Sequence, residues 1–319
     1  MTAVRLLPSR TDATSTSAPH HFVLRFGLAL LAGLIAAAIL SPFAAWGLAA
    51  IGLHFPFPRI FDRTVMATLL IALLVYARRL SLLEFLREGF ARPLADRREF
   101  AIGLAVSLGV ILILFALTAA AGCGSLLPVL PLAERALKYT AAALLIAVIE
   151  EAFFRAFLLA GIRFEYGQRA ALIASAMVYA LVHVLRSPAH IYLSGYHPMA
   201  GFQNLALSAA RLGHPVEVMP VLIGLFILGI VLGEAFILTG KVYLSIGLHA
   251  GFVIGAKTWP LVVGHQVAPR WLAGPGPVPL IAAPAAWTAA IIIAAVLPLI
   301  YRQRVESRLA ARPAKFRLG

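Results

Sequence analysis

Long apolar runs recur throughout this chain of 319 residues, and eight of them approach the length that a helix needs to cross a membrane. A membrane-spanning helix needs about 20 predominantly apolar residues. Hydrophobic residues make up 61% of the chain and charged residues only 13%, far fewer than in soluble domains. We therefore expect an all-α, polytopic integral membrane protein with about eight transmembrane helices. The runs lie near residues 24–51, 63–78, 100–122, 136–162, 169–186, 218–238, 242–260 and 284–301.

The net charge of +14 is concentrated in short connections and in the C-terminal tail. Basic residues crowd the segment 78–98, and six more follow residue 301. The positive-inside rule then predicts that both termini and these connections lie in the cytoplasm. The basic residues form no stripe interleaved with aromatic residues, so we do not expect nucleic-acid binding. The single cysteine, Cys123, excludes an internal disulfide.

Two adjacent acids interrupt the fourth apolar run. Glu150 and Glu151 are followed by Arg155 inside this run. Each charge in a membrane span costs about 2.5–3.5 kcal/mol even on the lenient insertion scale, so such residues usually serve chemistry or transport. On a regular α-helix, Glu151 and Arg155 share a face and can form an ion pair, whereas Glu150 lies about 140° from Arg155. We expect Glu150 to be the less neutralised carboxylate and to face a cavity, although a structural polar cluster would give the same pattern.

Two histidines strengthen the functional interpretation. His183 lies in the fifth apolar run and His249 in the seventh. A lone histidine in an apolar helix is more often a packing residue than a catalyst. Three small residues of the seventh run, Gly247, Gly251 and Gly255, form a face for close helix packing, and His249 projects roughly opposite to it. Acids, an arginine and two histidines on three helices therefore indicate a polar site within the membrane.

The ordered motifs resemble a known family. Glu150-Glu151-xxx-Arg155, then Tyr179-xxx-His183, then His249 resemble the CPBP family of CAAX prenyl endopeptidase (Rce1-like) intramembrane proteases, which includes the Abi proteins. The resemblance covers residues 136–260, which would form the catalytic core. It leaves 1–21 as a disordered cytoplasmic tail, 22–135 as N-terminal transmembrane helices, and 261–319 as an outer loop, a last helix and a basic tail.

The resemblance implies that the protein hydrolyses a peptide bond of a membrane-associated substrate. Glu150 with His183 would activate a water, and His249 would stabilise the oxyanion. Glu151, Arg155 and Tyr179 would support the site. A prenylated CAAX-like protein or a C-terminal sorting signal would be the substrate, in the cytoplasmic membrane of a bacterium.

An unusual residue and a set of possible metal ligands leave the mechanism open, and two other functions fit the same residues. The family usually has asparagine four residues after the last histidine, where this chain has Val253. Glu150, His183 and His249 would also make a three-ligand zinc site, but the same groups can work without metal, and we favour the metal-free form. A proton-coupled transporter would use the same buried acids. A catalytically silent immunity or scaffold protein of the same family is a third possibility.

Overall fold

The computed structural model describes residues 21–94, 96–122, 129–185, 191–262, 269–274 and 280–301, and within these ranges it contains helices and no strand. The elements are α1 (Phe22–Ala50), α2 (Phe57–Val75), α3 (Leu82–Gly89), α4 (Arg97–Ala120), α5 (Val129–Glu151), the π-helix η1 (Ala152–Leu159), α6 (Ala160–Tyr166), α7 (Gln168–Val184), α8 (Ala200–Ala210), the short 3-10 helix η2 (Arg211–Gly213), α9 (Pro215–Thr239), α10 (Tyr243–Val262), α11 (Arg270–Ala273) and α12 (Pro284–Ile300).

Each of the eight apolar runs coincides with a helix. By length and composition, α1, α4 and α9 of the described residues are able to cross a membrane, and α7 and α12 are shorter apolar helices. The all-α, polytopic membrane fold is confirmed, whereas the number of eight spans stays a prediction. The fourth run differs most from its prediction, because α5, η1 and α6 follow one another where one continuous helix was expected.

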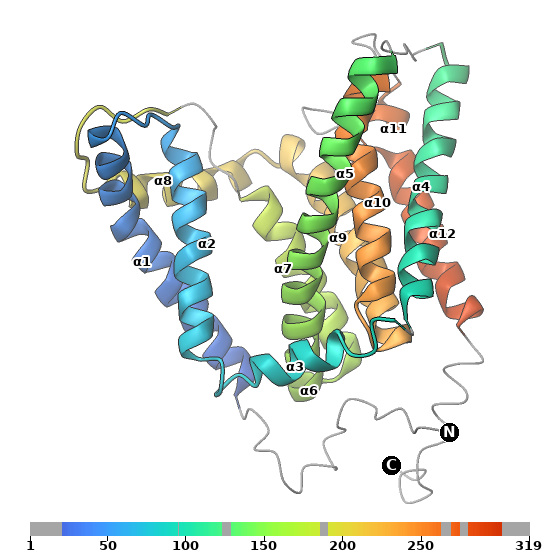
Figure 1. Ribbon diagram of the computed structural model, residues 1–319, viewed down its shortest axis with the longest axis horizontal. Coiled ribbons are helices and arrows are strands. Elements are labelled where there is room, and N and C mark those ends of the chain that lie inside the picture. The colour runs from blue at the N-terminus through green and yellow to red at the C-terminus, as the bar shows by residue number, and fades with distance from the viewer. Residues whose placement is uncertain are drawn as a thin grey trace, which may run out of the picture.

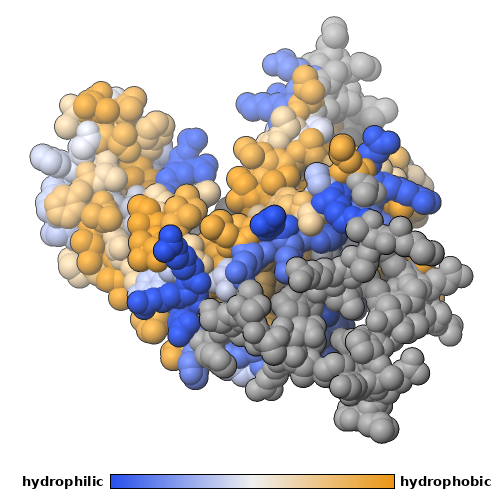
Figure 2. All heavy atoms as spheres, turned by 60° about the horizontal axis from the view of Figure 1, so that its bottom comes forward, coloured by the Kyte–Doolittle hydropathy of each residue, from blue (hydrophilic) through white to orange (hydrophobic). Residues whose placement is uncertain are grey.

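The helices form two groups (Figure 1). Helices α4, α5, α7, α9, α10 and α12 pack into a bundle, in which α10 lies against α4, α5 and α9. The α1–α2 pair stands to one side and contacts the rest of the structure mainly through α6 at its lower end and α8 at its upper end. The space-filling view of Figure 2 shows a notch between these two lobes, with apolar surface on both of its sides.

Close backbone contact joins α10 to α4. A methyl group on Gly247 would lie 2.8 Å from the backbone nitrogen of Leu104, and Gly103 of α4 is equally close to the backbone of α10. The predicted packing face of Gly247, Gly251 and Gly255 is therefore confirmed. Because this face is occupied by α4, the opposite face of α10 is turned toward α5, where Lys257 lies over the ring of Tyr139.

Gly247→Ala is expected to lower the free energy of unfolding by about 1–3 kcal/mol, because the added methyl meets backbone that cannot move aside. Gly109→Ala in α4 is the matched control, since open space surrounds that position and alanine favours helix. Denaturation of both variants in detergent micelles measures the difference. Equal stability of the two variants would show that the α4–α10 contact is not tight.

Helix α3, at the lower end of the bundle, is held from two sides. Gly89 at the end of α3 packs directly against Ala156 of η1. Carbonyls at and just after the end of α3 accept hydrogen bonds from the α9–α10 connection and the start of α10, namely Lys241 Nζ to Glu88 O at 2.6 Å and Tyr243 Oη to Phe90 O at 2.7 Å. These contacts fix α3 against the π-helix that directly follows the two adjacent acids.

Candidate active site

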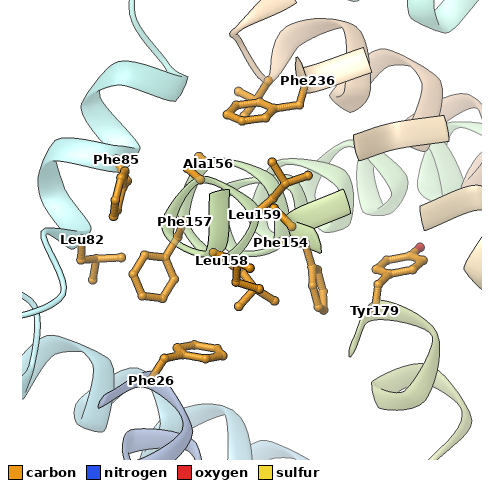
Figure 3. Close-up of a cluster of buried hydrophobic side chains, with 14 of the residues drawn as sticks. Phe26, Leu82, Phe85, Phe154, Ala156, Phe157, Leu158, Leu159, Tyr179 and Phe236 are labelled. Carbon is orange, nitrogen blue, oxygen red and sulfur yellow. The ribbon is translucent and has the colours of Figure 1, made fainter. Parts of the chain in front are cut away.

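The π-helix η1 begins immediately after Glu151. A π-helix has hydrogen bonds between residues five apart, and such turns occur frequently at functional sites. In Figure 3 the buried side chains of η1 point outward in several directions, toward Leu82 and Phe85 of α3, Phe26 of α1, Phe236 of α9 and Tyr179 of α7. Packing on all these sides holds the wide turn in place, and local periodicity in the sequence gave no sign of it.

Glu151 lies between Arg155 and His249 in the buried part of the site. Its Oε2 is 3.3 Å from Nε of Arg155, and its Oε1 is 2.8 Å from Nδ1 of His249. Glu151 and Arg155 are fully buried, and only 1% of His249 is exposed. The predicted ion pair between Glu151 and Arg155 is therefore present, and the same carboxylate also orients the imidazole of α10.

Arg155 has further contacts that sequence reasoning missed. Its Nη2 donates to the carbonyl of Gly229 on α9 at 3.3 Å, and its guanidinium lies 4.9 Å from the ring centre of Tyr179. Gly229 is recognisable in the sequence only as a small packing residue. It allows α9 to approach Ala176 of α7 closely, and the arginine binds the backbone at that point.

Glu150 lies on the more open side of the cluster. Its Oε2 is 3.3 Å from Nε2 of His183 and 3.7 Å from Nε2 of His249. The side chains of Glu150 and His183 are each 24% exposed, whereas that of Glu151 is fully buried. The structure thus brings together all three residues predicted to be catalytic, and Glu150 is the more exposed of the two acids. Their catalytic roles stay predictions.

The hydrogen bonds of the two imidazoles leave the same ring nitrogen facing Glu150. Nδ1 of His183 donates to the carbonyl of Tyr179 at 2.8 Å, because a carbonyl can only accept. Nδ1 of His249 faces the carboxylate of Glu151 and donates to it. In each histidine the hydrogen bond of Nδ1 fixes the orientation of the ring, and Nε2 is the atom turned toward Glu150.

Tyr179 forms an aromatic wall of the site. Its ring lies 4.4 Å from that of His183 and 6.0 Å from that of His249, measured between ring centres. Phe154 of η1 packs edge-on against Tyr179. Tyr179 therefore contacts both Arg155 and His183 with its ring, and its backbone carbonyl orients the imidazole of His183.

The geometry gives no support to a zinc site. Within the described ranges of the chain, no group of three or more His, Cys, Asp or Glu side chains is arranged so that it could hold a metal ion. Whether the protein binds one stays a prediction.

We expect purified, active protein to carry no stoichiometric metal and to keep its activity in the presence of a chelator. Elemental analysis of the protein, with His183→Ala analysed in parallel, measures this directly. About one zinc per wild-type chain that is lost in His183→Ala would contradict the expectation, because structural and catalytic metals depend on their ligands in this way.

Comparisons with known proteins give one match, to a family model. Searches with the chain found no match among curated proteins or among solved structures. Residues 132–255 match the family model described as type II CAAX prenyl endopeptidase Rce1-like. This range contains Glu150, His183 and His249 together with the elements that position them. The central part of the chain, residues 132–255, is therefore similar to the Rce1-like family of CAAX prenyl endopeptidases.

Proposed function

We propose that this protein is an intramembrane endopeptidase in which Glu150 is the general base. The observation that carries the proposal is the convergence of two Nε2 atoms on one Glu150 oxygen. That oxygen, Oε2, accepts no hydrogen bond from the described residues although it is itself buried. A buried carboxylate oxygen without a donor is costly. A water that donates to it would satisfy this oxygen and stand ready for deprotonation.

His183 is suited to hold this water. Its Nδ1 proton is committed to the carbonyl of Tyr179, so Nε2 of the neutral ring carries a lone pair. Because Nε2 of His183 lies 3.3 Å from Glu150 Oε2, a water beside this pair can donate to the carboxylate and stay in contact with the imidazole. Its oxygen then points away from both side chains, toward the position of a substrate carbonyl. Positioned general bases contribute roughly 10²–10⁴-fold to a rate.

His249 is suited to stabilise the oxyanion. Its Nδ1 lies 2.8 Å from Glu151 Oε1, and its Nε2 lies 3.7 Å from Glu150 Oε2. When this ring carries both of its protons, Nε2–H can donate to the negative oxygen that forms when water attacks the peptide carbonyl, while Nδ1–H stays on Glu151.

The substrate class follows from the family. Rce1-like proteins are described as CAAX prenyl endopeptidases, so we propose a membrane-anchored protein with a prenylated CAAX-like end, with a C-terminal sorting signal as the second candidate. We propose that the protein lies in the cytoplasmic membrane of a bacterium. The basic connections support an orientation in which both termini are in the cytoplasm.

The proposal is tested with purified protein in lipid nanodiscs and a farnesylated peptide that ends in a CAAX sequence. We expect release of the terminal tripeptide without any ion gradient. A transporter using the same buried acids would show gradient-dependent uptake in vesicles and no cleavage. A silent family member would show neither activity, and either of these results would contradict the proposal.

Val253→Asn tests how the oxyanion is stabilised. The family usually has asparagine at this position, one helical turn after His249. We expect the variant to cleave no faster than wild type, because a site that already has its donors gains nothing and a buried amide without a partner costs about 1–3 kcal/mol. Turnover of the peptide by Val253→Asn, with and without Tyr179→Phe, measures this. A gain approaching 10²-fold in the single variant would show that the wild-type site lacks a donor.

A further inference from the structure

A groove lies between α1 and α2, and none of the residues that line it belongs to the acid–histidine cluster. Its volume is about 490 Å³, within the range of small-molecule sites. Apolar side chains from the second half of α1, from α2 and from their connection form most of its lining, and two of them, Leu40 and Ile71, are 49% and 60% exposed. In a membrane protein, such a surface is in contact with lipid chains.

The groove has a charged end. Arg59 and Arg63 both line it, and they lie one helical turn apart on the same face of α2. The guanidinium of Arg59 lies 5.6 Å from the ring centre of Phe55, and Nη1 of Arg63 is 3.5 Å from Sδ of Met66. Neither of these contacts neutralises an arginine. The described residues that line the groove include no aspartate or glutamate, so its charge is entirely positive.

The helix boundaries place this charged end at the edge of the apolar layer. Helix α2 begins at Phe57, six residues before the predicted apolar run, with Pro58 in its first turn. Arg59 and Arg63 therefore lie in the first two turns, beside the α1–α2 connection at the upper left of Figure 1. Ile71 lies about 12 Å further along the helix axis. The groove thus runs from Arg59 and Arg63, at the edge of the apolar layer of the membrane, toward the interior of that layer.

We propose that this groove binds an anionic phospholipid, with its phosphate at Arg59 and Arg63 and one acyl chain lying between α1 and α2. Arginine forks bind phosphate oxygens in pairs, and the guanidinium is more weakly hydrated than an ammonium group. Leu40, Ala44 and Ile60 line the groove as a surface for the chain. A zwitterionic headgroup fits less well, because the groove offers no carboxylate for its ammonium group.

Native mass spectrometry of the delipidated full-length protein tests the proposal. The probes are phosphatidylglycerol, phosphatidylcholine with the same chains, and water-soluble glycerol phosphate. We expect phosphatidylglycerol to bind more tightly than phosphatidylcholine and to lose about 30-fold in Arg59→Gln/Arg63→Gln, which corresponds to about 1 kcal/mol for each arginine near a lipid surface. Ala44→Phe is expected to weaken the same lipid by filling the groove.

The charge-matched control is Arg97→Gln/Arg98→Gln, which removes two exposed arginines at the start of α4, at the lower end of Figure 1. It is expected to bind phosphatidylglycerol as wild type does. Equal loss in both double variants would show general charge attraction and overturn the proposal. Equal binding of the two lipids to wild type would also overturn it, as would glycerol phosphate that competes as well as phosphatidylglycerol does.

Discussion

Glu150→Gln is expected to reduce peptide cleavage by roughly 10²–10⁴-fold while leaving the yield of folded protein close to that of wild type. Glutamine keeps the shape of the side chain and can still contact His183, but it cannot accept a proton from water. The side chain is 24% exposed, and the ion pair of the buried Arg155 is with Glu151, so we expect the fold to tolerate the loss of the Glu150 charge.

The matched control for this variant is Glu234→Gln. Glu234 is a half-buried acid of α9, and within the described part of the chain it forms no ion pair with the acid–histidine cluster. It is expected to retain turnover. Initial rates with the farnesylated peptide and the yield of monodisperse protein are measured for both variants. Full turnover by Glu150→Gln, or equal losses in the two variants, would contradict the assignment of the base.

Glu151→Gln is expected to act mainly on stability, with a loss of about 3–5 kcal/mol in the free energy of unfolding. Arg155 is fully buried, and its ion pair with Glu151 at 3.3 Å is the contact that neutralises it. Removing the carboxylate leaves a guanidinium in an apolar interior. Because folded proteins are stable by only about 5–15 kcal/mol, a loss of this size lowers the amount of folded protein.

A double-mutant cycle separates this effect from a general loss of packing. Arg155→Met removes the cation that Glu151→Gln leaves unpaired, so the double variant is expected to regain part of the stability lost in Glu151→Gln alone. Its activity is expected to stay low, because His249 no longer has the carboxylate that holds its Nδ1. If the double variant loses as much stability as the two single variants together, Glu151 and Arg155 do not depend on each other.

Much of the fold could be predicted because apolar runs report directly on helices. The run predicted at 284–301 is α12, Pro284–Ile300, and that at 169–186 is α7, Gln168–Val184. Helix α3, however, lies in a connection that was recognised only by its arginines. Its one-sided packing on η1 depends on a partner distant in sequence. The early start of α2 was hidden by Arg59 and Arg63, which hydropathy alone assigns to a loop.

The site was predictable in its residues but not in its geometry. Spacing on a regular helix predicted the Glu151–Arg155 pair, and the structure contains it. No spacing rule relates Glu150 to His183 or His249, because these lie on different helices. The π-helix after Glu151 and the contact between Arg155 and Gly229 O arise from tertiary packing, which a single sequence does not reveal.

A comparison of membrane proteomes tests the central proposal most directly. Cells that contain the wild-type protein and cells that contain Glu150→Gln at the same level are compared by sequencing protein C-termini. We expect at least one membrane-anchored protein to accumulate with an uncut C-terminus in the variant alone, and to be processed again when the wild-type chain is restored. Identical C-termini in both strains, with the two chains equally abundant, would contradict the proposal that Glu150 drives peptide cleavage in the membrane.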